Sequence, residues 1–196
     1  PYATAPVRAT LPVLAVSNGA LVADRSTPFV ADQRLQVAVL TDFCNECGNC
    51  VTACPTSGRP YVDKPRLYLD RADFEAQASN AFMLGGDGTI EGRFDGATHR
   101  VAQLGRSGGD GGDGDGFDGR DGALEYTTPG FRALLDRSTF AVLDATLTGA
   151  PDGARLTTEP AAVMTTLLAG ITGSLPHIPT AGGSGGSRIS HPGYAE

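Results

Sequence analysis

Short runs of apolar and β-branched residues recur along the chain and predict a protein built largely from strands. Two of these runs occupy residues 11–16 and 35–40, and the turn-forming residues between them include Asn18 and Gly19. We therefore predict that the two runs pair as a hairpin and lead into the loop that follows.

The middle of the chain alternates between helix-like and strand-like stretches. A short helix is predicted over residues 73–82. Residues 89–94 and 98–102 are expected to form a hairpin, because the Asp95-Gly96 pair between them is a strong turn signal.

The last third of the chain carries the clearest helical pattern. Strands are predicted at residues 123–126 and 139–143, with a short helix at 131–135 between them. A longer helix is predicted over residues 158–169, with Gly170 as its end. Three of its apolar residues mark one stripe that should pack on the core, namely Val163, Leu167 and Ile171.

Residues 105–122 interrupt this pattern, because half of them are glycine and most of the others are polar. Such a segment buries little apolar surface, and we predict a mobile acidic loop. The alternative is calcium binding, since residues 108–113 match the start of a Gly-Gly-x-Gly-x-Asp repeat, although only one copy is present. Residues 181–196 are rich in Gly and Ser and are predicted to form a flexible tail.

The charge of the chain narrows the classes of partner. The net charge is −7 and the sequence pI is about 4.9, so the chain should repel a phosphate backbone, and nucleic-acid binding is disfavoured. No apolar run approaches the roughly 20 residues that a membrane-spanning helix needs. No signal peptide is visible at the start, and we expect a cytoplasmic protein.

All four cysteines lie close together in the sequence, at Cys44, Cys47, Cys50 and Cys54. Their spacing is C-x2-C-x2-C-x3-C-P, which is typical of bacterial ferredoxins that bind a [4Fe–4S] cluster. The small, turn-forming residues between them allow the backbone to curl around a cluster and to point N–H groups at its sulfurs. A short helical turn is predicted at residues 49–53. We therefore predict that the four cysteines are the metal ligands and hold this cofactor.

Other uses of clustered cysteines fit this spacing less well. A zinc site usually has two C-x2-C pairs separated by a dozen or more residues. A disulfide framework has cysteines spread over several loops, typically in a secreted protein.

The role of Cys54 is the open point of the motif. In ferredoxins with two clusters, the fourth cysteine, which precedes proline, binds the other cluster. This sequence holds no fifth cysteine. Either all four cysteines bind one cluster, or the partner motif lies outside this sequence.

The stretch from Asp42 to Pro55, followed by Thr-Ser-Gly-Arg-Pro-Tyr-Val-Asp-Lys-Pro, resembles the C-terminal ferredoxin-like region of the selenate reductase subunit family. Those proteins are large flavin and iron–sulfur oxidoreductases related to the small chain of glutamate synthase. In that family an earlier cysteine motif ends in Cys-Pro-Asn-Arg-Ala. Here Ala5-Pro-Val-Arg-Ala stands at about the corresponding distance upstream, with Ala5 in place of the cysteine.

The resemblance implies that FAD and NAD(P) belong to an upstream region or a partner chain. It also implies larger redox subunits or domains as partners, of the flavin, iron–sulfur or molybdenum type. Because the sequence begins with Pro1, we expect a processed chain or a piece of a longer protein.

We predict an α+β fold, in which a small ferredoxin-like iron–sulfur module precedes a loop-rich, mostly β C-terminal extension. The predicted divisions are a ferredoxin-like module, a helix and hairpin extension, a flexible loop, a small α+β region and a flexible tail, at residues 1–70, 71–104, 105–122, 123–180 and 181–196.

The predicted function is electron transfer through the cluster, as a component of a larger oxidoreductase and without a catalytic pocket of its own. The alternative is a structural or assembly subunit, in which the cluster or a zinc ion only stabilises the fold. The three histidines lie outside any metal-ligand spacing and are expected to be structural or exposed, namely His99, His177 and His191.

Overall fold

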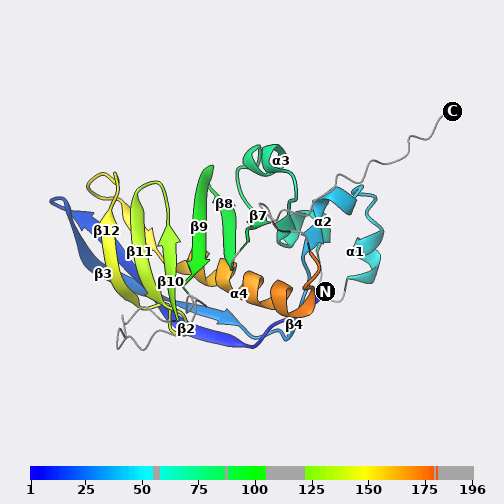
Figure 1. Ribbon diagram of the computed structural model, residues 1–196, viewed down its shortest axis with the longest axis horizontal. Coiled ribbons are helices and arrows are strands. Elements are labelled where there is room, and N and C mark those ends of the chain that lie inside the picture. Colours follow the sequence, from blue (N-terminus) through cyan, green and yellow to red (C-terminus); the bar gives the residue numbers. More distant parts are fainter. Residues whose placement is uncertain (55–57, 87, 105–121, 179, 181–196) are drawn as a thin grey trace, which may run out of the picture.

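The computed structural model describes residues 1–54, 58–86, 88–104, 122–178 and 180. Its main element is one large sheet. Within these residues the sheet has eight strands in the order β12-β11-β10-β9-β8-β7-β6-β5, so that strands adjacent in sequence are also neighbours in space (Figure 1). The strands are β5 (Val39–Leu40), β6 (Arg66–Leu67), β7 (Ala81–Leu84), β8 (Thr89–Phe94), β9 (Ala97–Gln103), β10 (Ala123–Thr127), β11 (Phe131–Asp136) and β12 (Val142–Leu147).

The sheet changes character along its width. From β7 to β12 neighbouring strands are antiparallel, whereas β5, β6 and β7 are parallel to one another. Parallel neighbours require crossover connections. The crossover from β5 to β6 contains the short helices η1 (Thr41–Phe43), α1 (Asn49–Ala53) and α2 (Pro60–Asp63), and the crossover from β6 to β7 contains α3 (Arg71–Glu75).

A long hairpin forms a second layer on one face of this sheet. It consists of β2 (Val7–Ser17) and β3 (Ala20–Ala31), with β13 (Arg155–Thr157) paired to β2. Asn18 and Gly19 form its two-residue turn, with φ of 51° and 72°, as a tight hairpin requires. The predicted pairing of residues 11–16 with 35–40 is therefore wrong. The turn at Asn18-Gly19 reverses the chain directly after β2, so that β2 pairs with β3 instead.

The stretch at 35–40 is divided between two pairings. Its first residues form β4 (Leu35–Gln36), which pairs antiparallel with β1 (Tyr2–Ala3). Its last residues form β5, which pairs parallel with β6. The stretch thus links the N-terminal layer to the edge of the large sheet.

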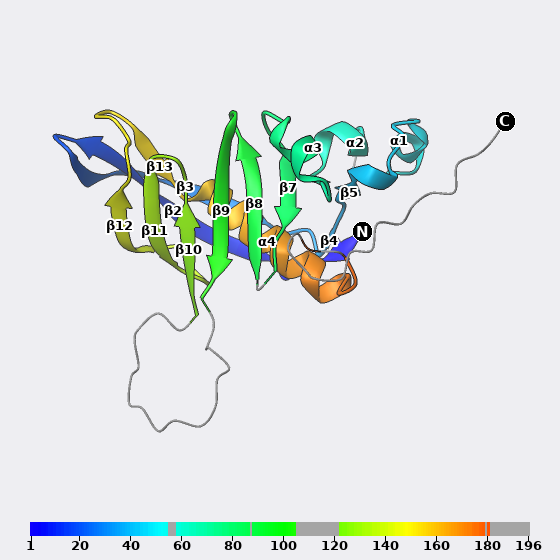
Figure 2. The same ribbon diagram turned by 45° about the horizontal axis from the view of Figure 1, so that its top comes forward.

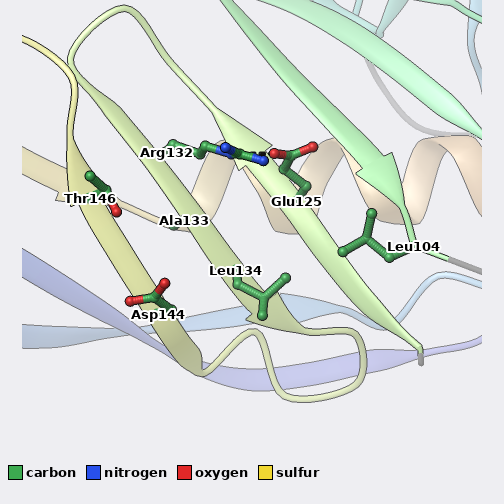
Figure 3. Close-up of a pocket in the computed structure, with 7 residues that line it drawn as sticks. All are labelled: Leu104, Glu125, Arg132, Ala133, Leu134, Asp144 and Thr146. Atoms are coloured by element: carbon green, nitrogen blue, oxygen red, sulfur yellow. Dashed lines mark hydrogen bonds and ion pairs between the residues drawn. The ribbon is translucent and has the colours of Figure 1, made fainter. Parts of the chain in front are cut away.

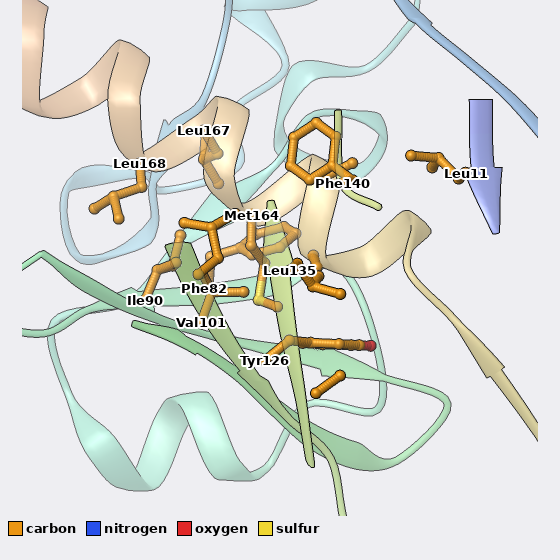
Figure 4. Packing of buried hydrophobic residues seen from close by; sticks show 14 of the residues in the cluster. Leu11, Phe82, Ile90, Val101, Tyr126, Leu135, Phe140, Met164, Leu167 and Leu168 are labelled. Carbon is orange, nitrogen blue, oxygen red and sulfur yellow. The ribbon is translucent and has the colours of Figure 1, made fainter. Parts of the chain in front are cut away.

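The long helix α4 (Glu159–Ser174) packs across the large sheet on the same face as the hairpin (Figure 2). Its buried residues, including Met164, Leu167 and Leu168, meet strand residues such as Phe82 and Ile90 in the main core (Figure 4). Predicted core residues Leu167 and Ile171 are buried, whereas Val163 is only partly buried.

The helix does not end at Gly170 as predicted. A Cβ atom at Gly170 would lie 2.5 Å from Cδ2 of Tyr2, so the missing side chain makes room for that ring. Glycine is needed at this position because the helix packs closely against Tyr2, and it does not end the helix.

A smaller core lies on the opposite face of the sheet. It contains Tyr68, Phe74 from α3, and Ala81 and Met83 from β7. All four residues of β7 are buried, because this strand is covered on both faces. The helix predicted over residues 73–82 is therefore correct only at 73–75, because α3 ends at Glu75 and β7 begins at Ala81.

Two further predictions differ from the structure. Residues 131–135 form part of strand β11, in which Phe131, Ala133 and Leu135 are buried in alternation, so the predicted helix is wrong. The strand predicted at 139–143 begins only at Val142, after Phe140 adopts a φ of 57°.

Several local predictions are confirmed. The hairpin of β8 and β9 turns at Asp95 and Gly96, with φ of 49° and 80°. Strand 123–126 lies within β10, and helix 49–53 is α1. Within the described residues, no helix combines the length and the apolar character needed to cross a membrane.

The predictions for the Gly/Asp-rich segment, apart from Gly122, and for the tail at 181–196 fall outside the described residues. The ferredoxin-like fold class and the division of the chain into regions stay predictions.

Candidate iron–sulfur site

The cysteine motif lies in the crossover that leaves the end of β5, at one edge of the large sheet (Figure 2). Two side chains fix the start of this crossover to the end of β6. The hydroxyl of Thr41 donates to the carbonyl of Leu67 at 2.8 Å. The carboxylate of Asp42 accepts from the N–H of Leu69 at 3.1 Å. The cysteine loop therefore begins from an anchored position.

The end of the crossover is fixed by Asn80, which immediately precedes β7. Its side-chain amide donates to the carbonyls of Val62 and Lys64, each at 3.0 Å. Within α2, the carboxylate of Asp63 accepts from the backbone N–H of Arg59 at 2.6 Å. The chain thus returns to the sheet along a defined path.

The cysteine loop turns through two left-handed residues. Glu46 has a φ of 53° and Gly48 a φ of 80°. The side chain of Asn45 accepts a hydrogen bond from the N–H of Cys47 at 3.3 Å. A Cβ atom at Gly48 would meet nothing within 4 Å. Glycine is therefore favoured here by the left-handed backbone conformation and not by lack of space for a side chain.

All four cysteines line one cavity of about 590 Å³. An apolar part of its wall is formed by the chain around β5, from Val37 to Leu40. Phe43, Pro60 and Tyr61 also border the cavity. Side chains of Cys44 and Cys54 are half-buried, and those of Cys47 and Cys50 are exposed.

This arrangement fits an iron–sulfur cluster. A [4Fe–4S] cluster takes four thiolates at four separate iron atoms, so its ligands surround a cavity. Within the part of the chain that the structure describes, no three histidine, cysteine or carboxylate side chains, the four cysteines included, lie close enough together to hold a metal ion, so the thiols border the cavity without meeting at one point. An apolar wall also shields a cluster from water, which is one of the factors that set its potential.

The sequence comparisons agree with this reading of the loop. Residues 37–57 match the 4Fe-4S binding domain family. The match covers β5, the cysteine loop and α1, and it supports an iron–sulfur cluster as the cofactor of this segment. The predicted cofactor type is thus confirmed, while the ligand role of each cysteine stays a prediction.

Two curated relatives share a longer segment with the chain. The proteins named "Putative oxidoreductase YgfK" from Escherichia coli strains K12 and O157:H7 are each 39% identical to it over 51 residues. That segment is 26% of this chain and 5% of the length of each relative. No solved structure gives a significant match. The region is therefore similar to part of an oxidoreductase, and the resemblance to the selenate reductase subunit family in particular stays a prediction.

The other residues singled out from the sequence lie away from this cavity. Ala5 borders a separate cavity between the N-terminal segment and α4. His99 is half-buried, and its Nδ1 lies 2.8 Å from the hydroxyl of Tyr126. Burial lowers the pKa of His99 and raises that of Tyr126. His177 is exposed, and His191 lies outside the described residues.

A third hollow, of about 260 Å³, lies on the outer face of β10, β11 and β12 (Figure 3). An ion pair between Arg132 and Glu125 crosses it, and Asp144 lies on the neighbouring strand. Apart from the buried Ala133, the residues around it are exposed or half-buried. We interpret these charges as the solvated face of the sheet.

Sequence reasoning missed the residues that support the site. Thr41, Asp42 and Asn80 act through backbone groups more than 15 residues away in the chain. Single polar residues of this kind belong to no recognisable sequence motif. Asn80 has a left-handed backbone with a φ of 52°. Because Asn is enriched in this conformation, Asn80 is the one of the three that the sequence could have indicated as a turn residue.

Proposed function

We propose that the chain is the electron-transfer component of a larger oxidoreductase and holds one [4Fe–4S] cluster with Cys44, Cys47, Cys50 and Cys54. The observation that carries this proposal is the single cavity lined by all four cysteines. When bound, such a cluster supplies reversible one-electron chemistry. The protein positions the thiolates, provides the apolar wall beside β5 and leaves the outer cysteines near solvent, where a partner can approach.

The same cavity supports local ligation by Cys54. In a two-cluster arrangement the fourth cysteine would point to another site. Here it borders the same space as the other three cysteines, while Ala5, at the position compared with an upstream cysteine, borders a different one. We therefore favour one cluster with four local ligands.

The remaining parts of the redox chain belong to other regions or subunits. We propose that FAD and NAD(P) are bound by an upstream region or a partner chain, and that flavin, iron–sulfur or molybdenum domains are the redox partners. The similarity of 51 residues to part of a much longer oxidoreductase supports this division of labour. We also propose a cytoplasmic location, because the reducing cytosol keeps cysteines as the free thiols that a cluster takes as ligands.

Anaerobic purification followed by iron and zinc analysis, and then by redox titration with spin-resonance detection, tests the proposal. We expect about four irons per chain and a reversible one-electron reduction. Zinc in place of iron would contradict the cluster. An iron cluster that cannot be reduced and reoxidised would favour the structural alternative.

A further inference from the structure

The surface beside the cysteines exposes an aromatic side chain that the fold itself does not use. Phe43 follows Asp42 and precedes Cys44, borders the cysteine cavity and is 76% exposed. It is the most exposed of the large hydrophobic side chains in the described residues. Val51, on α1 directly after Cys50, is 40% exposed. Aromatic side chains that stand in solvent on a fixed backbone are frequent energetic centres of protein interfaces.

The backbone under Phe43 is held in place. The preceding residues, Thr41 and Asp42, bond to the end of β6, and the N–H of Cys44 donates to the carbonyl of Thr41 at 2.9 Å. Phe43 therefore projects from an anchored turn. A pre-positioned side chain loses less conformational entropy when a partner binds.

The charge around Phe43 specifies the kind of partner. Glu46 is the charged residue among those that line the cavity, and Asp42 precedes Phe43 directly. A [4Fe–4S] cluster bound by four thiolates adds further negative charge. Two acidic side chains beside an exposed apolar one are complementary to basic side chains around an apolar recess.

We propose that Phe43 and Glu46 form a docking surface for a redox protein domain that presents an apolar recess ringed by Lys or Arg. This inference rests on the proposed function, since it assumes a cluster behind the surface. Docking there would bring the partner's redox centre towards the exposed cysteines, Cys47 and Cys50, that would hold the cluster. One electron then passes from the reduced cluster to the partner, and no bond is made or broken.

The test uses the full chain with its cluster, reduced with dithionite and freed of excess reductant, and oxidised cytochrome c as a basic haem protein. Each transfer oxidises the cluster by one electron and reduces one ferric haem to ferrous haem. Ferricyanide, a small anion that needs no docking surface, is the control acceptor. Iron content is matched before any rates are compared.

We expect Phe43→Ala to lower the second-order rate constant for cytochrome c about tenfold. Glu46→Gln should lower it less and should weaken its decline with rising ionic strength. Leu143→Ala removes a side chain that is 53% exposed on β12, at the other edge of the sheet, and should leave the rate unchanged. The ferricyanide rate should be the same in wild type, Phe43→Ala and Leu143→Ala, and it should rise in Glu46→Gln, because loss of a negative charge eases the approach of this anion.

An unchanged cytochrome c rate in Phe43→Ala would overturn the docking surface. An equal fall with ferricyanide would overturn it too, because Phe43 would then act on the cluster itself. A wild-type chain without a reducible cluster would instead contradict the proposed function, so the two failures can be told apart.

Discussion

The carboxylate of Asp42 accepts a hydrogen bond from the backbone N–H of Leu69 at 3.1 Å and so joins the cysteine loop to the end of β6. The two residues are 27 positions apart, and they hold together both ends of the crossover that carries the cysteines. The sheet thereby fixes the position of a loop that contributes little to the core.

Removing this acceptor should loosen the cluster without unfolding the sheet. A single hydrogen bond contributes about 0.5–1.5 kcal/mol. We expect Asp42→Ala to lose iron to a chelator up to about tenfold faster than the wild type. Asp42→Asn retains an acceptor oxygen and is the matched control. Equal rates of iron loss in Asp42→Ala and wild type would show that the bond does not support the site.

Two glycines of α4 offer a matched test of the packing. Gly170 faces the ring of Tyr2, whereas a Cβ atom at Gly173 would meet nothing within 4 Å. Gly170→Ala should therefore lower the free energy of unfolding by about 1–3 kcal/mol through overpacking. Gly173→Ala should leave it unchanged or raise it by up to about 1 kcal/mol, because alanine favours the helix. Urea unfolding followed by circular dichroism measures both, and a stable Gly170→Ala variant would contradict the close approach.

His99 should make stability depend on pH. Burial lowers the pKa of its imidazole in the folded chain, so between that pKa and the ordinary value near 6.5 the unfolded chain binds more protons. The free energy of unfolding should thus fall as the pH drops below about 6.5. His99→Gln should show a smaller decline, measured by urea unfolding between about pH 5 and 8. Parallel pH profiles for the two proteins would show that His99 is not responsible.

Removal of iron separates the electron-transfer role from the structural one. The main core is formed by strands and α4, and none of its fully buried members comes from the crossover at 41–65. We expect chelated protein to keep its far-ultraviolet circular dichroism, while a protease gains new cleavage sites within the crossover. Loss of the sheet signal together with the iron would favour a cluster that stabilises the whole fold.

The sequence analysis succeeded where the signal was local. The cysteine spacing and the turn at Asp95-Gly96 each involve neighbouring residues. The iron–sulfur cofactor type and the turn are both confirmed, while the ligand role of each cysteine stays a prediction. It failed where distant segments decide the outcome. The stretch 35–40 has no partner nearby, because its two halves pair with β1 and with β6.

The helix predicted over 158–169 is confirmed as α4, but its end at Gly170 and the helix predicted at 131–135 are wrong for a related reason. Gly170 has the local character of a helix stop, yet its role is set by Tyr2, which lies at the other end of the chain. Residues 131–135 have little periodicity of their own, and pairing with β10 and β12 makes them a strand. In both cases tertiary contacts overrode the local preference.

The central claim is that the four cysteines around one cavity hold a single cluster. The most direct measurement compares the iron content and the spin-resonance spectrum of Cys54→Ser with those of Cys47→Ser, both purified anaerobically. We predict that Cys54→Ser loses iron as severely as Cys47→Ser or retains a three-iron form. A full cluster of about four irons in Cys54→Ser, together with loss in Cys47→Ser, would contradict the claim and assign Cys54 to another site.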